Sequence, residues 1–566
     1  MCGIFYFQRL LKLGEKFGIH IDFLKTLQKQ FIESNHRGPD NSIFINDPHY
    51  NCERCWGFHR LSINGLTSES NQPFLIKNCR LICNGEIYNF RKLIEEYKLE
   101  NDYKSGSDCE IIIHLYRLIG IEEMLRKVDG VFAFVLTDYD NNTTYIARDP
   151  VGVRSLYIGN MNGFSQDIAV ASEMKSLQFC EAYTIRQFPG GCYAKYDKNM
   201  HLHFYTYYEN VWLDIKQDEY FNIYQYKTNY FYETVDDTEE NICKNIVTLF
   251  EDAVKKRLMS ERKVGALLSG GLDSSSVVAI MCKYTDPKNL NTYSIGLPGS
   301  VDLLWAKKVA DYLGTNHHEI CLTEKLFLDA INDTIYQIES YDTTSIRASL
   351  PNYLISKYIY RNSDDVVIYC GDMSDEIFGS YRGFLKATSE ADFKNENERM
   401  VRDVCYFDLL RSDKSISGAG LEARVPFADK KFLQYVMSIP PKYKLFNDEK
   451  IEKYIFRKAF DGLLPTDILW RRKEAFSDGV SGHERSWFQI IKEHIDTIVT
   501  DEEFVNCRSK YNYHNPPYDK ESYYYRKIFE LYYNKCGKTI PYYWRHPFCD
   551  ADLDPSARLL NFYKAE

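Results

Sequence analysis

An apolar segment at residues 264–268 runs directly into Ser269-Gly270-Gly271-Leu272-Asp273-Ser274-Ser275, and a helical pattern follows as far as Met281. This order predicts a buried strand, a glycine-rich turn and a helix. Glycines let backbone amides approach an anion, and a helix N-terminus adds its positive end, so the unit is typical of a phosphate cradle. It is not a Walker A loop, because Gly-Lys-Ser/Thr is missing. A serine-rich helix cap is the alternative interpretation.

Cys2 directly follows the initiator methionine. Methionine aminopeptidase removes Met1 when the next side chain is small, so we expect the mature chain to begin with cysteine. The thiol then lies beside its own α-amino group, whose reference pKa is about 7.7–8.0. One residue can supply both the nucleophile and the base. The alternative is an N-terminal cysteine that occurs by chance.

The first 200 residues read as short apolar strands separated by turn signals and interrupted by helical patterns, which predicts an α+β layered structure. Ser107 and Asp108 are expected to cap a helix start. The strands are expected at 80–83, 130–136 and 144–148, and the helices at 21–34, 89–97 and 108–127.

Several polar clusters punctuate these elements. They are His36-Arg37-Gly38-Pro39-Asp40, His59-Arg60-Leu61-Ser62-Ile63, Asn71-Gln72-Pro73, Cys83-Asn84-Gly85-Glu86-Ile87-Tyr88-Asn89, Gly106-Ser107-Asp108 and Ala147-Arg148-Asp149-Pro150-Val151-Gly152. With Cys2 in front, their order resembles the glutaminase domain of class II glutamine amidotransferases over essentially the first 190 residues. The resemblance implies an N-terminal nucleophile fold with layered antiparallel sheets and helices.

This resemblance also implies roles in glutamine hydrolysis. Arg60 would clamp the α-carboxylate of glutamine, and Glu86 and Asp108 would hold its α-ammonium. Asn84 and the amide of Gly85 would donate to the oxyanion that forms when the thiol attacks. Solvated surface charge is the alternative for Arg60 or Asp108, and a hairpin turn is the alternative for Asn84-Gly85.

The phosphate cradle resembles the pyrophosphate loop of N-type ATP pyrophosphatases. Together with the glutaminase clusters, the chain resembles the glutamine-hydrolysing asparagine synthetases over about 1–545. The resemblance implies a second, α/β doubly wound parallel-sheet domain with ligands at the carboxyl ends of its strands. The expected divisions are 2–200 for the glutaminase domain, 201–237 for a linker or insert, 238–545 for the ATP pyrophosphatase domain and 546–566 for an acidic, exposed tail.

In this second half, Asp273 and Asp375 would hold Mg²⁺ against the phosphates of ATP. Lys473 would neutralise charge that develops during transfer. Arg347 is a candidate for the aspartate carboxylate, with an ion pair to a nearby acid as the alternative. The expected ATP-binding residues are Leu267, Ser269, Gly270, Gly271, Asp273, Ser274, Ile295, Cys370 and Gly371.

Two segments depart from the family pattern. The family has Ser-Gly-Glu-Gly-Ser-Asp-Glu where this chain has residues 370–376, so Asp372 is a shortened catalytic carboxylate and Met373 replaces a glycine. We expect Met373 to restrict the backbone to negative φ. Residues 8–17 are longer and more basic than the family pattern, and we expect a local excursion near the first strand.

The composition narrows the partners and the compartment. A net charge of −10 gives no general attraction to nucleic acid or to an anionic membrane. No signal peptide or membrane-spanning run is visible, and 16 cysteines in such a chain suggest reduced thiols in a cytoplasmic, cytosol-like compartment. We expect Cys52 and Cys55 to be a surface or loop pair rather than a metal site, and His317-His318 to be structural or close to a substrate. Assembly, including a homodimer, is left open.

The expected function is ATP-dependent synthesis of asparagine from aspartate, with glutamine as nitrogen donor. The resemblance implies a glutamyl thioester on Cys2, a β-aspartyl-AMP intermediate, and ammonia that passes through an interdomain tunnel. Two alternatives stay open: an amidotransferase of the same build with another carboxylate acceptor, and a non-catalytic binding or regulatory descendant. The changes at 370–373 are the only feature that favours the last.

Overall fold

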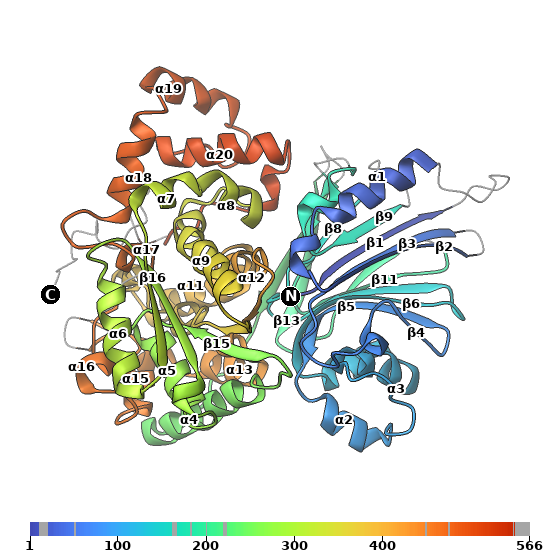
Figure 1. Cartoon of the computed structure of the whole chain (residues 1–566), viewed down its shortest axis with the longest axis horizontal. Coiled ribbons are helices and arrows are strands. Elements are labelled where there is room, and N and C mark those ends of the chain that lie inside the picture. The colour runs from blue at the N-terminus through green and yellow to red at the C-terminus, as the bar shows by residue number, and fades with distance from the viewer. Residues whose placement is uncertain are drawn as a thin grey trace.

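The computed structural model describes residues 1–10, 21–49, 52–160, 167–180, 184–199, 201–218, 223–447, 450–473, 476–546 and 548. The chain forms two lobes, and its N-terminus lies between them (Figure 1). Within the described residues, no helix is both long and apolar enough to cross a membrane. Residue 547 and residues 549–566 of the expected acidic tail, and residues 11–17 of the expected excursion, lie outside these ranges. Residues 8–10 simply continue the first strand.

The first lobe contains two six-stranded sheets in which every strand pairing is antiparallel. Side chains on the facing sides, such as Tyr6 and Val135, form one apolar layer between the sheets. In order, the first sheet is β10 (Arg186–Gln187), β8 (Tyr157–Gly159), β9 (Ile168–Ala171), β1 (Gly3–Leu10), β3 (Cys52–Arg60) and β2 (Asn41–His49), and the second is β12 (Leu202–Thr206), β11 (Cys192–Tyr196), β7 (Thr143–Arg148), β6 (Gly130–Asp138), β5 (Cys79–Ile87) and β4 (Phe74–Ile76).

Helices cover the outer faces of both sheets. Helix α1 (Ile21–Ile32) packs Phe31 against Phe5 of β1, with ring centroids 6.1 Å apart. On the other side lie α2 (Phe90–Tyr97) and α3 (Ile111–Lys127) (Figure 1). Ser107 caps a short 3-10 turn that leads directly into α3. The expected layered α+β structure is confirmed. Helix α3 is broken at Gly120, where φ is +78°.

The second lobe is built on a five-stranded parallel sheet, as expected. Along β18, Val367 packs on one face of this sheet and Ile368 on the other, so both faces are buried under helices. Chain order reverses direction at β15, which leaves a crevice between the carboxyl ends of β15 and β18. The strand order is β17 (Asn316–Cys321), β16 (Asn291–Gly296), β15 (Lys263–Leu267), β18 (Asp365–Tyr369) and β19 (Glu422–Arg424).

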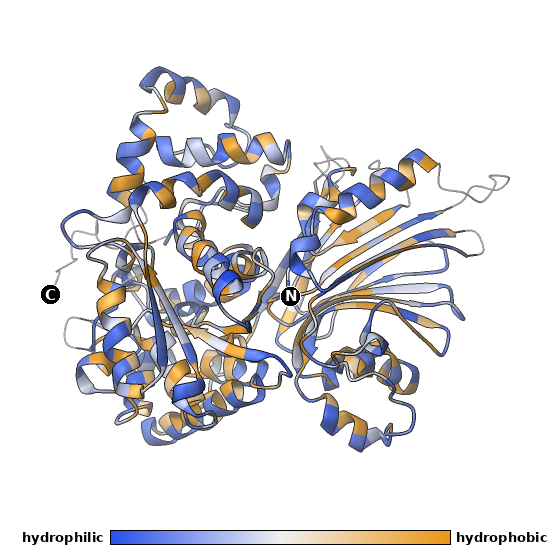
Figure 2. Ribbon diagram, in the orientation of Figure 1, coloured by the Kyte–Doolittle hydropathy of each residue, from blue (hydrophilic) through white to orange (hydrophobic). Residues whose placement is uncertain are grey.

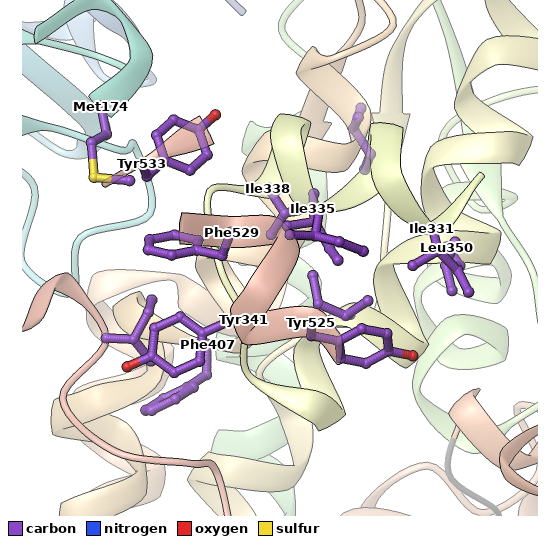
Figure 3. Packing of buried hydrophobic residues seen from close by; sticks show 14 of the residues in the cluster. Met174, Ile331, Ile335, Ile338, Tyr341, Leu350, Phe407, Tyr525, Phe529 and Tyr533 are labelled. Atoms are coloured by element: carbon purple, nitrogen blue, oxygen red, sulfur yellow. The ribbon is translucent and has the colours of Figure 1, made fainter. Parts of the chain in front are cut away.

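Helices surround this sheet and extend the lobe, with apolar and polar residues alternating along them (Figure 2). One cluster joins α8 (Ile331–Ile338) to α20 (Lys520–Tyr532), where Ile335 and Ile338 lie near Phe529 (Figure 3). The other helices are α4 (Glu239–Lys256), α5 (Leu272–Met281), α6 (Val301–Leu313), α7 (Glu324–Asp329), α9 (Thr343–Asn362), α10 (Ser374–Phe378), α11 (Glu390–Asp403), α12 (Asp408–Ser417), α13 (Lys430–Ser438), α14 (Pro441–Lys444), α15 (Tyr454–Ala459), α16 (Thr466–Leu469), α17 (Phe476–Gly479), α18 (Trp487–Asp496) and α19 (Asp501–Lys510).

Residues 201–237, where the sequence shows no firm periodicity, contain three strands rather than a simple linker. β12 is an edge strand of the second antiparallel sheet, while β13 (Val211–Asp218) and β14 (Ile223–Tyr230) form a hairpin. Along β12 the side chains are only half-buried or exposed, so the apolar alternation that marks a buried strand is weak.

Two sequence pairs have structural explanations. Cys52 and Cys55 are buried in β3, not at the surface as expected, and their side chains join apolar clusters on opposite sides of the sheet. His317 shares hydrogen bonds of 3.0 Å with Thr292 and Ser294, and His318 stacks on a tyrosine on the other face. Neither pair can present two ligands to one ion.

Candidate active sites

A pocket in the first lobe brings together most of the residues expected to handle glutamine. Its lining includes Cys2 at the start of β1, Arg60 at the end of β3, Gly85 and Glu86 of β5, and Asp108 before α3. Four segments that are distant in sequence therefore converge on one small cavity, because the two sheets and the 3-10 turn meet there.

Cys2 lies under the loop that follows β3. The amide of Leu61 donates to Cys2 Sγ over 3.4 Å, and the thiol lies 3.6 Å from the Leu61 carbonyl. Burial raises the pKa of the Cys2 thiol to about 11, with Met1 still attached. The Met1 ammonium donates to the carbonyl of Leu421 at 2.9 Å, so the extreme N-terminus is anchored on the second lobe.

Arg60 is buried and is held by neutral oxygens. Its guanidinium donates to the carbonyl of Thr67 at 2.8 Å, to Asn71 Oδ1 at 2.6 Å and to the carbonyl of Gly65. These contacts fix the side chain without neutralising its charge. The cation is therefore not committed to a carboxylate of the protein in the contacts above, as a clamp for a substrate carboxylate requires.

Glu86 and Asp108 form the acidic side of the pocket. Asn64 donates to Glu86 at 2.7 Å, and the amide of Ile87 donates to Asp108 at 2.6 Å. Burial, with Asp108 nearby, raises the pKa of Glu86 well above its usual range, and burial raises that of Asp108 to about 6. Two buried carboxylates in contact with one cavity favour a cationic ligand group there.

Asn84 and Gly85 are in the middle of β5, opposite Ala133 and Phe132, so the hairpin-turn alternative is wrong. The cavity side of β5 favours glycine, because an added Cβ at Gly85 would lie 2.3 Å from the Val131 carbonyl. Asn84 is 1% exposed, and its Nδ2 donates to no atom of the described residues. Asn84 does not itself line the pocket, although its neighbours Cys83 and Gly85 do, and its unused donor is the feature that an oxyanion-binding role requires.

A second cavity, larger than the first, lies at the carboxyl ends of β15, β16 and β18, where the doubly wound fold places ligands. All nine expected ATP-binding residues except Gly270 line it. Gly270 has φ +72°, and a Cβ there would lie 2.3 Å from the backbone of Trp305. A Cβ on Gly371 would meet the amide of Ser274 at 2.8 Å. The glycines are thus required by close backbone approach.

Asp273 and Asp375 face one cation position in this cavity. The ammonium of Lys453 lies 2.6 and 2.7 Å from the two oxygens of Asp273, and 2.7 Å from Asp375 Oδ1. Lys473 pairs with the other oxygen of Asp375. Asp375 is half-buried, and these two ammonium groups hold its pKa well below its usual range. Two carboxylates that converge on one positive centre are a donor set that fits Mg²⁺.

Lys453 was not identified from the sequence. It precedes α15 with φ +57° and is 2% exposed. A lysine before an amphipathic helix is ordinarily a solvated charge, so no local signal separates it from its exposed neighbours. Only the tertiary fold brings it to the acidic pair.

Arg347 does not lie in the lining of this cavity. Its guanidinium forms a bidentate pair with Glu521 of α20, at 2.8 and 2.7 Å, and both side chains are buried. Arg347 therefore forms an ion pair with an acidic residue of the protein, which was the alternative interpretation of this residue. The segment at 471–479 does reach the cavity through Lys473, while residues 474–475 lie outside the described residues.

Met373 adopts φ +74°, the left-handed region, so the expectation of a negative φ is wrong. The turn between β18 and α10 fixes this conformation even without glycine. Burial of the methionine side chain, which is 1% exposed in an apolar cluster, offsets a strain of about 1–2 kcal/mol. The backbone of Met373 thus keeps the conformation that a glycine would favour.

Asp372 lines the cavity beside Arg411 of α12, which sequence reasoning also missed. Asp372 Oδ1 accepts from Arg411 at 2.8 Å, and Arg411 Nε donates to Asp408 at 3.1 Å. An arginine one turn inside a helix is an ordinary surface residue by pattern, and only the packing of α12 against the sheet buries it.

An amidotransferase-type lobe with an N-terminal thiol, joined to a nucleotide-binding α/β lobe, defines a two-site amidotransferase. Comparison with known proteins agrees with this class. The glutamine amidotransferase domain profile matches residues 1–211, and the asparagine synthase profile matches residues 245–399 and 387–550.

The chain is similar over nearly its whole length to curated relatives. It is 40% identical over 555 residues to asparagine synthetase [glutamine-hydrolyzing] of Gallus gallus, covering 94% of this chain and 95% of the relative. It is 39% identical over 551 residues to the Homo sapiens protein of the same name, with the same coverage. The chain therefore belongs to the asparagine synthase family, which confirms the resemblance and the ligase class.

Proposed function

We propose that this chain makes asparagine from aspartate, glutamine and ATP, and releases glutamate, AMP and pyrophosphate. One observation carries the proposal. A single chain joins a pocket lined by Cys2, Arg60, Glu86 and Asp108 to a second cavity that contains a glycine-rich loop and two carboxylates paired with two lysines. Each pocket has the groups that one half of the reaction requires.

In the first pocket, Cys2 would attack the side-chain amide of glutamine. Its own α-amino group, once Met1 is removed, would take the thiol proton and pass it to the leaving ammonia. Arg60 would bind the α-carboxylate, and Glu86 and Asp108 the α-ammonium. Asn84 and the Gly85 amide would stabilise the oxyanion. Water would then release glutamate from the thioester.

In the second cavity, the glycine loop would hold the phosphates of ATP, with Leu267 and Ile295 against adenine. Asp273 and Asp375 would hold Mg²⁺, which supplies charge neutralisation on the phosphates. The β-carboxylate of aspartate would displace pyrophosphate from the α-phosphate, while Lys473 offsets the developing charge. Ammonia from the first pocket would cross between the lobes and displace AMP from the β-aspartyl adenylate.

Lys453 would not compete with this arrangement. Its ammonium stands where positive charge is needed between the two carboxylates, and it would turn toward the phosphates when a metal ion takes that position. Two carboxylates and two lysines carry no net charge among themselves, so added ATP must bring its own cation.

The experiment replaces Asp273 by Asn and measures AMP, pyrophosphate and glutamate with either glutamine or ammonium as nitrogen source. The proposal predicts that AMP and pyrophosphate stop with both sources while glutamate release from glutamine continues. Pyrophosphate release at ordinary Mg²⁺ concentrations would contradict it. An acceptor series with unaltered enzyme, in which another carboxylate acid outperforms aspartate, would favour the alternative amidotransferase.

A further inference from the structure

One corner of the ATP cavity has two charged side chains that each keep one atom without a hydrogen-bond partner. Arg411 Nη1 and Asp372 Oδ2 are buried, and each makes no hydrogen bond within the described residues. Arg411 is 4% exposed, and both residues line the cavity. A buried guanidinium hydrogen and a buried carboxylate oxygen without partners are costly unless a ligand satisfies them.

These two unused atoms belong to two residues that are in contact. Asp372 Oδ1 and Arg411 Nη2 are 2.8 Å apart in a single-point contact, while Arg411 Nε is used by Asp408 instead of by the second oxygen of Asp372. A bidentate arginine–carboxylate pair would have used both oxygens of Asp372 and two nitrogens of Arg411. The pair instead leaves one donor and one acceptor unused within the described part of the chain.

The other lysines and arginines that line the cavity are already engaged: Arg457 donates to Glu452 at 2.8 Å, and Arg472 also has a partner. Lys453 and Lys473 are tied to the acidic pair at the phosphate end, and Arg471 lies over the ring of Trp305 beside the glycine loop, 4.8 Å from its centroid. The guanidinium of Arg347 forms an ion pair with Glu521 outside the cavity. Arg411 is therefore the cation placed to meet a second carboxylate away from the phosphates.

We propose that Arg411 and Asp372 form the clamp that recognises the acceptor as an α-amino acid. Arg411 Nη1 donates to its α-carboxylate, and Asp372 Oδ2 accepts from its α-ammonium. Both groups sit on one carbon of the acceptor, so two protein residues in contact with each other can bind them together. The assignment rests on the proposed function, deepens it, and gives Arg411 the carboxylate-binding role that the sequence suggested for Arg347.

The clamp is tested by binding, without turnover. Equilibrium dialysis with a non-hydrolysable ATP analogue measures labelled aspartate, displaced by succinate, which lacks the α-ammonium, and by 3-aminopropanoate, which lacks the α-carboxylate. For unaltered protein we expect aspartate to bind roughly 10- to 100-fold more tightly than either analogue, the range of one charged hydrogen bond.

Two variants should give crossed results. In Arg411→Gln, aspartate should lose its advantage over 3-aminopropanoate but keep most of its advantage over succinate. In Asp372→Asn, the advantage over succinate should disappear and that over 3-aminopropanoate should persist. Asp408→Asn is the matched control, because it removes the other partner of Arg411 without removing a clamp group, and it should leave most of both preferences in place.

Glutamate release from glutamine reports that each variant is folded, and Arg411→Lys should recover part of the preference that Arg411→Gln loses. The same loss for both analogues in both variants, or no preference in unaltered protein, would overturn the clamp. If the protein binds aspartate with the crossed pattern but never forms asparagine, the proposed function fails while the clamp stands.

Discussion

Arg37 and Asp413 form an ion pair of 2.9 Å between the two lobes, with side chains that are 0% and 1% exposed. Arg37 also donates through Nε to the carbonyl of Cys2 at 3.0 Å. Asp413 lies on α12, two residues after Arg411 of the proposed clamp. One buried pair thus ties the backbone of Cys2, the proposed nucleophile, to the helix that lines the second cavity.

Replacing Asp413 by Asn should remove one of the two carboxylates that pair with the buried Arg37, because Glu173 stays 3.1 Å from Arg37 Nη1, and the loss should cost about 1–3 kcal/mol. We expect a lower thermal midpoint and a larger loss of glutamine-dependent than of ammonia-dependent synthesis. Asp329→Asn is the control, because its pair with Lys325 is largely exposed and contributes about 0–1 kcal/mol. Equal thermal midpoints for the two variants would show that the interlobe pair does not stabilise the chain.

Removal of Met1 should be required for glutamine hydrolysis. With Met1 attached, the nitrogen of Cys2 is a peptide amide that cannot accept a proton, and burial raises the thiol pKa to about 11. A chain with an uncleaved N-terminal extension should therefore lose glutaminase activity, while ammonia-dependent synthesis continues. Intact-mass measurement establishes which N-terminus is present. Full glutamate release from a chain shown to retain Met1 would refute the role of the α-amino group.

His59 should make the first lobe sensitive to acid. Burial lowers the pKa of its imidazole from 6.5 to about 4, while it hydrogen bonds to the Phe31 carbonyl and to Ser42. The unfolded chain therefore binds a proton that the folded chain does not between pH 6.5 and 4, and stability falls by about 3 kcal/mol as pH drops through that window. His59→Gln should flatten this part of the curve of thermal midpoint against pH, whereas exposed His201→Gln should not. An unchanged slope in His59→Gln would contradict the assignment.

Met373→Gly should lower stability without stopping adenylation. Relief of left-handed strain gains about 1–2 kcal/mol, but loss of the buried side chain costs about 2–5 kcal/mol. Because the backbone of Met373 already has φ +74°, the turn that carries Asp372 should not move. Pyrophosphate formation should stay within roughly threefold of the unaltered enzyme. A loss of tenfold or more in a variant that remains folded would show that the side chain itself positions the acceptor.

The parts of this molecule that local patterns encode were predictable from the sequence. The strand–glycine–helix unit at Ser269 and the ordered polar clusters around Arg60 identify both lobes, because turn chemistry and apolar runs are local properties. Partnerships between distant residues were not predictable. Glu521 lies 174 residues from Arg347, and no local pattern in either segment predicts that the two side chains pair. Met373 shows the same limit for the backbone, since a turn fixed by tertiary packing overrides the preference of its side chain.

The most direct test of the whole account follows the amide nitrogen. Protein with Cys2 at its N-terminus is incubated with amide-¹⁵N glutamine, aspartate, ATP and Mg²⁺, and the products are separated and weighed by mass spectrometry, with Cys2→Ala in parallel. The account predicts ¹⁵N-asparagine from the unaltered enzyme, formed with equal amounts of AMP and pyrophosphate. It predicts none from Cys2→Ala unless ammonium is added. Unlabelled asparagine, ADP with phosphate in place of AMP, or label transfer by Cys2→Ala would contradict it.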